Sequence, residues 1–90
     1  MPISSQKKRE LKQKAHHLHP VIIIGHHGLT PAVIAETDNA LKTHELIKVK
    51  INYERDERAE IAKELCIATE AELVQSIGSM VILYRENPEE

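Results

Sequence analysis

The chain has 90 residues, 41% of them hydrophobic and 29% charged, which is typical of one globular domain. With two tyrosines, no phenylalanine and no tryptophan, it argues against functions that rely on rows of stacking rings, such as the RRM sheet or OB-fold grooves. One cysteine, Cys66, excludes an internal disulfide and a multi-cysteine zinc site. There is no signal-peptide core and no apolar run of membrane-spanning length, so we expect a cytoplasmic protein without a membrane partner.

The net charge of −2 is unevenly distributed along the chain. Residues 1–51 carry eight lysines and arginines against four acidic residues, a net charge of +4, whereas residues 52–90 carry four against ten, a net charge of −6. All six histidines also lie in the first part. Charges of this kind often only solvate helices, but a segregated basic face can attract nucleic acid even on a slightly acidic protein.

The first element in chain order is a predicted helix that begins at Ser4-Ser5, where serine can cap free N–H groups. Leu11, Ala15 and Leu18 form one apolar stripe at helical spacing, and Pro20 is expected to end the helix. Its lysines flank the stripe on both sides, so the helix has no single positive face; they are Lys7, Lys8, Lys12 and Lys14.

A β-branched run over residues 21–24, closed by Gly25, predicts a strand buried on both faces. Thr30-Pro31 predicts the start of a second helix, with Thr30 as its cap and Pro31 at a position that needs no N–H. The buried face of this helix is expected to comprise Val33, Ile34, Ala40 and Leu41.

Residues 47–51 alternate between aliphatic side chains and the lysines Lys48 and Lys50, which predicts a strand with both lysines facing outward. A third helix is expected from Asp56, and two final strands over 73–77 and 80–84 are joined by a tight type II′ turn at Gly78-Ser79. Residues 87–90 read as a polar tail. The apolar stripe expected for the third helix is Ile61, Ala62, Leu65, Cys66 and Ala68.

The predicted order is therefore αβαβαββ within a single domain over residues 1–90, with a core from about 5 to 85. This order favours an α/β fold of the two-layer α+β kind, in which right-handed crossovers pack helices against a four-stranded mixed sheet. Three helices leave room for one open sheet face, and we expect Lys48 and Lys50 on that side.

The most informative motif is the GHHG loop, Gly25-His26-His27-Gly28, which leaves a strand and leads directly into a helix at Thr30. Glycine lets a foreign backbone approach closely, and a helix N-terminus favours an anion such as phosphate. The first helical turn carries no acidic residue that would compete. The loop lacks the Gly-Lys-Ser/Thr of a Walker A motif and the third glycine of a dinucleotide fingerprint. A KH domain clamps a nucleic-acid backbone with a similar loop.

Residues 11–85 resemble the CRM domain, named for chloroplast RNA splicing and ribosome maturation, in its bacterial stand-alone YhbY-like form. The segments that carry the resemblance are Ala15-His16, Leu18, Pro20-Val21, Ile24-Gly25, Gly28-Leu29-Thr30, Val33, above all residues 44–50 (HELIKVK), Ile77-Gly78 and residues 81–85 (VILYR). The two histidines inside the loop depart from the lysine, arginine or small polar residues frequent in the family.

The resemblance implies a fold related to the C-terminal domain of translation initiation factor three. It also implies RNA binding and association with precursors of the large ribosomal subunit. Together with the loop and the basic residues, it predicts an RNA-binding site without cofactor or metal. The predicted site residues are Gly25, His26, His27, Gly28, Thr30, Lys7, Lys8, Lys12, Lys14, Lys48 and Lys50.

The remaining reactive residues show no pattern of a catalytic or metal site. The histidines lack metal-ligand spacing, and Cys66 lies on an apolar stripe, where a packed thiol is expected rather than a nucleophile. Tyr53 and Tyr84 are expected to be partly buried, with base stacking by one of them as the alternative. No acid, base and nucleophile converge, so we expect no enzyme. The alternative function is an adaptor that binds an acidic protein through the same basic face.

Overall fold

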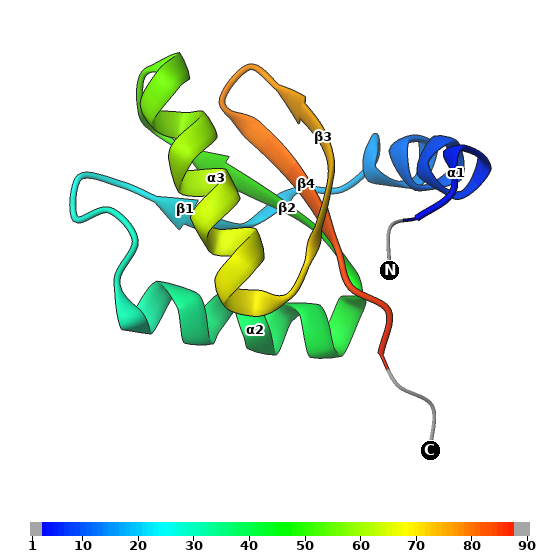
Figure 1. Cartoon of the computed structure of the whole chain (residues 1–90), viewed down its shortest axis with the longest axis horizontal. Coiled ribbons are helices and arrows are strands. Elements are labelled where there is room, and N and C mark those ends of the chain that lie inside the picture. The colour runs from blue at the N-terminus through cyan, green and yellow to red at the C-terminus, as the bar shows by residue number, and fades with distance from the viewer. Residues whose placement is uncertain (1–2, 88–90) are drawn as a thin grey trace.

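The structure, a computed structural model, describes residues 3–87. Its elements confirm the predicted order αβαβαββ (Figure 1). They are α1 (Ser5–Ala15), β1 (Pro20–Ile24), α2 (Pro31–His44), β2 (Leu46–Ile51), α3 (Arg55–Thr69), β3 (Glu72–Ile77) and β4 (Met80–Tyr84).

The four strands form one mixed sheet in the order β1-β2-β4-β3. Strand β1 runs parallel to β2, and the other two pairs are antiparallel. Parallel pairing of β1 and β2 follows from the crossover through α2, and the short turn after β3 makes the last pair antiparallel. The hairpin turn has a positive φ of 56° at Gly78 and none at Ser79, as a type II′ turn requires.

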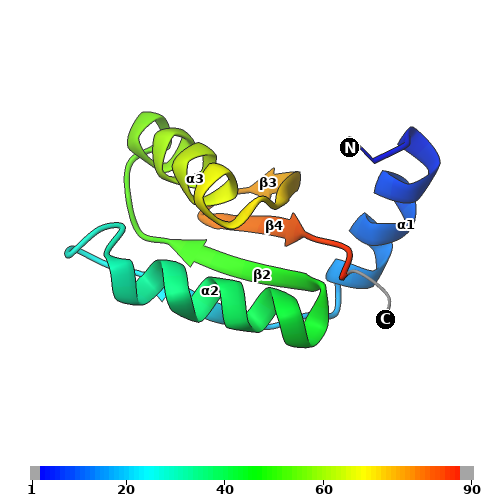
Figure 2. The same cartoon turned by 60° about the horizontal axis from the view of Figure 1, so that its bottom comes forward.

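Helices pack on both faces of the sheet. Alternate residues of each strand point to opposite faces, so one strand can contribute side chains to both cores. On β4, Val81 and Leu83 belong to the larger core under α2 and α3, whereas Ile82 and Tyr84 belong to a smaller core under α1. Figures 1 and 2 show α2 and α3 together on one side and α1 alone near the far end of the sheet. The second face is therefore only partly covered.

The local signals read from the sequence are confirmed at both helix caps. The Ser4 Oγ accepts a hydrogen bond from the Lys7 N–H at 3.1 Å, and the Thr30 Oγ1 accepts one from the Val33 N–H at 3.1 Å. The alternation in β2 is confirmed too, since Ile47, Val49 and Ile51 are buried in the larger core.

Strand β1 is not buried on both faces, and that prediction was wrong. It is an edge strand, and α1 packs mainly over β2 and β3, so no helix or strand among residues 3–87 covers its second side. Val21 and Ile23 are consequently 51% and 61% exposed, while Ile22 and Ile24 are buried.

Two further expectations need correction. Helix α1 ends at Ala15 rather than at Pro20. The chain must turn between α1 and β1, which begins at Pro20, and the residue before a proline disfavours the helical conformation. Leu18 still packs against the smaller core from the turn. On α3, Ala68 is exposed, and the buried side chains are Ala62, Leu65 and Thr69.

Candidate nucleic-acid interface

The GHHG loop lies beyond the C-terminal ends of β1 and β2. The Gly28 N–H donates a hydrogen bond to the Gly25 carbonyl at 2.9 Å, which closes a tight turn. His26 and His27 at the tip are exposed, with ring centroids 4.1 Å apart. The Asn52 N–H donates to the Ile24 carbonyl at 3.0 Å and fixes the base of the loop to the end of β2. The tip thus projects into solvent from a rigid base.

The two glycines of the loop have different roles. Gly28 has a φ of +72°, and a Cβ there would lie 3.4 Å from the Tyr53 hydroxyl, so both conformation and space favour glycine. Gly25 has no such φ, and a Cβ there would meet nothing within 4 Å. The fold itself therefore does not require glycine at position 25, and the space beside it is open to an outside group.

Helix α2 presents its N-terminus directly behind the loop. Thr30 uses its hydroxyl to cap the Val33 N–H, and Pro31 has no N–H, so the Ala32 N–H is left without an intrahelical partner. The first turn contains no acidic residue, as expected from the sequence. The partial positive charge of the helix is therefore not offset locally.

Lys48 and Lys50 alternate with the buried residues of β2, which places both on the face that bears α1. Lys50 stands between Ile23 of β1 and Met80 of β4 in the strand register. The ion pairs found within residues 3–87 are Lys42–Asp38 and Arg85–Asp38. Neither lysine of β2 is neutralised by a carboxylate there.

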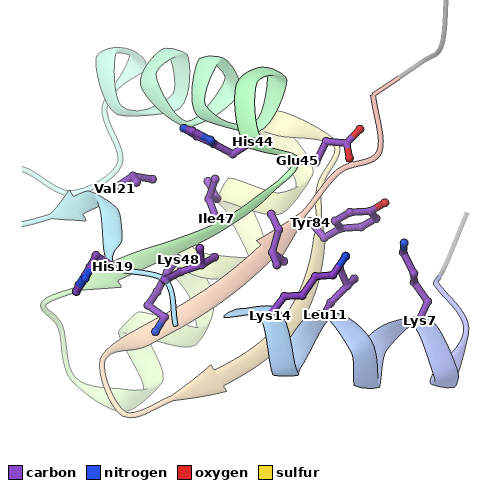
Figure 3. A pocket seen from close by; sticks show the side chains of 12 residues that line it. Lys7, Leu11, Lys14, His19, Val21, His44, Glu45, Ile47, Lys48 and Tyr84 are labelled. Carbon is purple, nitrogen blue, oxygen red and sulfur yellow. The ribbon is translucent and has the colours of Figure 1, made fainter. Parts of the chain in front are cut away.

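A groove of about 530 Å³, here called the α1 groove, separates α1 from the beginnings of β1 and β2 and the end of β4 (Figure 3). Lys7 and Lys14 line it from α1, and Lys48 lines it from β2. A smaller groove of about 240 Å³ lies beside α1 and is lined by Lys12 and again by Lys48. The α1 lysines therefore do flank the helix on both sides, with Lys48 common to the two grooves.

The predicted site residues thus form two groups at opposite ends of β2. The loop residues and Thr30 lie at one end, and Lys7, Lys14 and Lys48 gather at the other; Figures 1 and 2 show the loop and α1 far apart. Lys8 lines neither groove. Sequence reasoning missed Val21, His19 and Tyr84 as lining residues of the α1 groove, because no local pattern links such distant positions.

Glu45 forms the rim of the α1 groove in an unusual backbone conformation. Its φ of 64° and ψ of −42° are rare for a residue with a side chain. The C-terminal segment holds this turn, since the Arg85 N–H donates to the Glu45 carbonyl and the Asn87 N–H donates to the Glu45 Oε2, each at 2.9 Å.

Arg85 joins three elements behind this rim. Its guanidinium donates to the Asp38 Oδ1 at 2.6 Å and to the Thr69 carbonyl at 2.8 Å. The hydrogen bond from Arg85 to the Asp38 carboxylate holds the pKa of Asp38 below its usual value despite desolvation, and the positive charges of Arg85 and Lys42 contribute less. Arg85 thereby ties the end of β4 to α2 and to the end of α3.

Cys66 lies outside these surfaces and is partly buried. Burial, and then the charge of Glu72, raise the pKa of the Cys66 thiol to about 11, so it stays protonated and unreactive near neutral pH. Over residues 3–87, no three histidine, cysteine or acidic side chains gather as a metal site would require. Nor does any helix in that range have the length and apolar character to span a bilayer.

Residues 3–85 match the CRS1/YhbY (CRM) domain, and the chain belongs to this family. A Pseudomonas aeruginosa protein named a probable RNA-binding protein is 47% identical over 89 residues, which cover 98% of this chain and 86% of that protein. An RNA-binding protein of Haemophilus influenzae is 44% identical over 88 residues, covering 97% and 89%.

The fold matches the solution structure of a hypothetical protein from Staphylococcus aureus, described as a candidate RNA-binding protein. The TM-score is 0.85 at 39% identity, over 98% of this chain and 93% of the other. The resemblance read from the sequence and the predicted fold are both confirmed. The expectation of a non-enzymatic protein agrees with this family.

Proposed function

We propose that the protein binds RNA, with a phosphate of the bound strand held at the GHHG loop and the N-terminus of α2. Lys48 and Lys50 then contact further phosphates along the partly covered sheet face that bears α1. The names of the relatives from Pseudomonas aeruginosa and Haemophilus influenzae support RNA as the partner. The missing rows of aromatic residues favour recognition through the backbone over stacking.

The observation that carries this proposal is the open space at Gly25. Neither the φ of Gly25 nor the packing around it calls for glycine, while the loop leads into a helix start that has a free N–H and no nearby acid. A phosphate approaching the loop gives a physical reason for the small residue.

The salt dependence of binding tests the lysines of β2. Replacing Lys48 and Lys50 with glutamine should weaken binding to all single-stranded RNA sequences alike. It should also reduce the slope of log affinity against log salt by about 1.4, at roughly 0.7 for each lost phosphate contact. Fluorescence anisotropy with a labelled decauridylate from low to moderate salt measures this slope.

The matched control is the pair Arg55→Gln and Lys63→Gln, which removes the same charge from exposed positions on α3. This control should leave the slope nearly unchanged. Equal slopes for the parent and the Lys48/Lys50 variant would remove β2 from the RNA-binding surface.

We further propose that the RNA is ribosomal, in precursors of the large subunit. Sedimentation of a cell extract tests this, because RNase treatment should release the protein from large-subunit particles if RNA is the partner. Association that survives complete RNase digestion would instead assign the protein as an adaptor that binds an acidic protein partner.

A further inference from the structure

We propose that the α1 groove accepts one unstacked nucleotide of the bound RNA, with its base on the apolar floor and its phosphates at the lysines of the rim. This inference rests on the proposed RNA binding and adds a second contact at the opposite end of β2 from the GHHG loop. It assigns a base-contacting role to Leu11, Leu18 and Val21, which the sequence did not mark as binding residues.

The size and lining of the groove fit such a ligand. Its volume of about 530 Å³ lies within the range of sites that hold small organic molecules. Leu11, Leu18 and Val21 supply apolar surface from three segments of the chain, and the Tyr84 ring completes the wall between α1 and Glu45 (Figure 3). Val21 is the most accessible of these side chains, at 51% exposure.

The charges of the groove favour an anion. Lys7, Lys14 and Lys48 converge on it from α1 and β2, and none of them forms an ion pair within residues 3–87. The Lys7 Nζ lies 5.4 Å from the centroid of the Tyr84 ring, which is an aromatic rather than an acidic neighbour.

Among residues 3–87, Glu45 supplies the one carboxylate that lines the groove, and this carboxylate accepts a hydrogen bond from the Asn87 N–H. His19 and His44 also line the groove. The positive side chains therefore outnumber the single negative one.

A nucleotide matches both properties of the groove at once. An inorganic phosphate would leave the apolar floor in water, and an uncharged apolar ligand would leave three lysines without a partner. A nucleotide presents a flat base and a charged phosphate on one small unit. Tyr84 is only 6% exposed, so it acts as a wall of the groove and not as a free stacking platform.

The distance between the two contacts suits one RNA strand. Strand β2 spans about 17 Å from Leu46 to Ile51, with the groove at its first residues and the loop beyond its last. Lys48 lines the groove, and Lys50 follows it toward the loop on the same face of β2. A single strand of several nucleotides could therefore follow β2 from the loop to the groove.

The test separates base contacts from phosphate contacts. Two fluorescein-labelled decamers of equal charge are compared at fixed salt, a decauridylate and a decamer of abasic ribose phosphates. The parent protein should bind the decauridylate about tenfold more tightly, since each base seated on side chains adds to affinity. In Val21→Glu, the ratio of the two dissociation constants should fall close to one.

The matched control is Ile67→Glu, which adds the same charge at a 69% exposed aliphatic position on α3. The added carboxylate repels both decamers equally, so its long-range effect cancels in the ratio of the two dissociation constants. Ile67→Glu should therefore keep the ratio measured for the parent protein. Val21→Ser, which adds no charge, repeats the test if Val21→Glu has a lowered melting temperature.

Three results would overturn the proposal in distinguishable ways. Equal and salt-sensitive binding of both decamers by the parent would leave RNA binding intact and reject the groove. An unchanged ratio in both Val21 variants would place the base contact elsewhere. Failure of the parent to bind either decamer would reject the proposed function and the groove together.

Discussion

The two ends of β2 differ in the chemical groups that they present to an anion. At the loop end, the proposed binding groups are backbone N–H groups behind a pair of glycines, and the nearest helix carries no acid in its first turn. At the groove end, the proposed binding groups are the long side chains of Lys7, Lys14 and Lys48 above an apolar floor. The loop end therefore depends on shape and space, whereas the groove end depends on side-chain chemistry.

In the proposed interface, this difference gives the two ends separate tasks. A backbone clamp holds phosphate and is indifferent to the base, because every nucleotide carries the same phosphate. A groove with an apolar floor responds to the base itself. Substitutions at the two ends should accordingly change different properties of RNA binding.

The largest expected effect concerns Arg85, which supports the groove end. Arg85→Ala removes the hydrogen bonds to Asp38 and Thr69 and should lower the free energy of unfolding by about 2 kcal/mol, or the melting temperature by about 10 °C. Arg55→Ala, at an exposed position on α3, is the control and should have little effect. Thermal unfolding followed by circular dichroism measures both, and equal melting temperatures for the two variants would show that Arg85 is not a support.

The pH dependence of stability follows from the same contact. Because Arg85 lowers the pKa of Asp38 in the folded protein, the unfolded chain binds this proton more readily. The contribution of the ionised Asp38 carboxylate to the free energy of unfolding is therefore complete above the ordinary aspartate pKa of about 4. It is lost as the pH falls through the lower folded value. Asp38→Asn should lose stability less steeply than the parent below pH of about 4.

A smaller effect is expected from the histidines of the loop. Histidine ordinarily gains a proton near pH 6.5, and a bound phosphate favours the charged form, so RNA affinity should rise a few-fold between pH of about 8 and 6. The variant His26→Gln/His27→Gln should lose most of this increase, measured by anisotropy at fixed salt. His26→Lys/His27→Lys should bind at least as tightly as the parent at pH of about 8.

A second pair of adjacent histidines, His16 and His17, provides the control at the opposite end of the sheet. His16 and His17 follow α1 and are exposed, so His16→Gln/His17→Gln removes the same groups far from the loop. If this pair abolishes the pH dependence and the loop pair preserves it, the titrating groups lie at the α1 end.

Short-range signals made most of the fold and the loop end predictable from the sequence. Thr30-Pro31 marks a helix start through capping, and the alternation of residues 47–51 marks a strand with one buried face. The GHHG loop is contiguous, so its position between a strand and a helix follows from those neighbours.

The groove end could not be predicted in the same way. Its lining comes from α1, the segment leading into β1, the turn between α2 and β2, the first residues of β1 and β2, and the end of β4. Only the tertiary arrangement brings these segments together. The exposure of β1 was missed for a related reason, since four consecutive β-branched residues fit a central strand and an edge strand equally well. Which strands lie at the edges depends on pairing across the whole chain.

The central claim, that phosphate approaches the backbone of the GHHG loop, is tested most directly at Gly25. Because a Cβ there has free space and the φ is not left-handed, Gly25→Val should fold with an unchanged melting temperature. It should nevertheless bind decauridylate about tenfold more weakly, through loss of charge-assisted backbone hydrogen bonds. The control Ser76→Val adds the same side chain at an exposed position on β3 and should bind like the parent. A folded Gly25→Val protein with the affinity of the parent would contradict the claim.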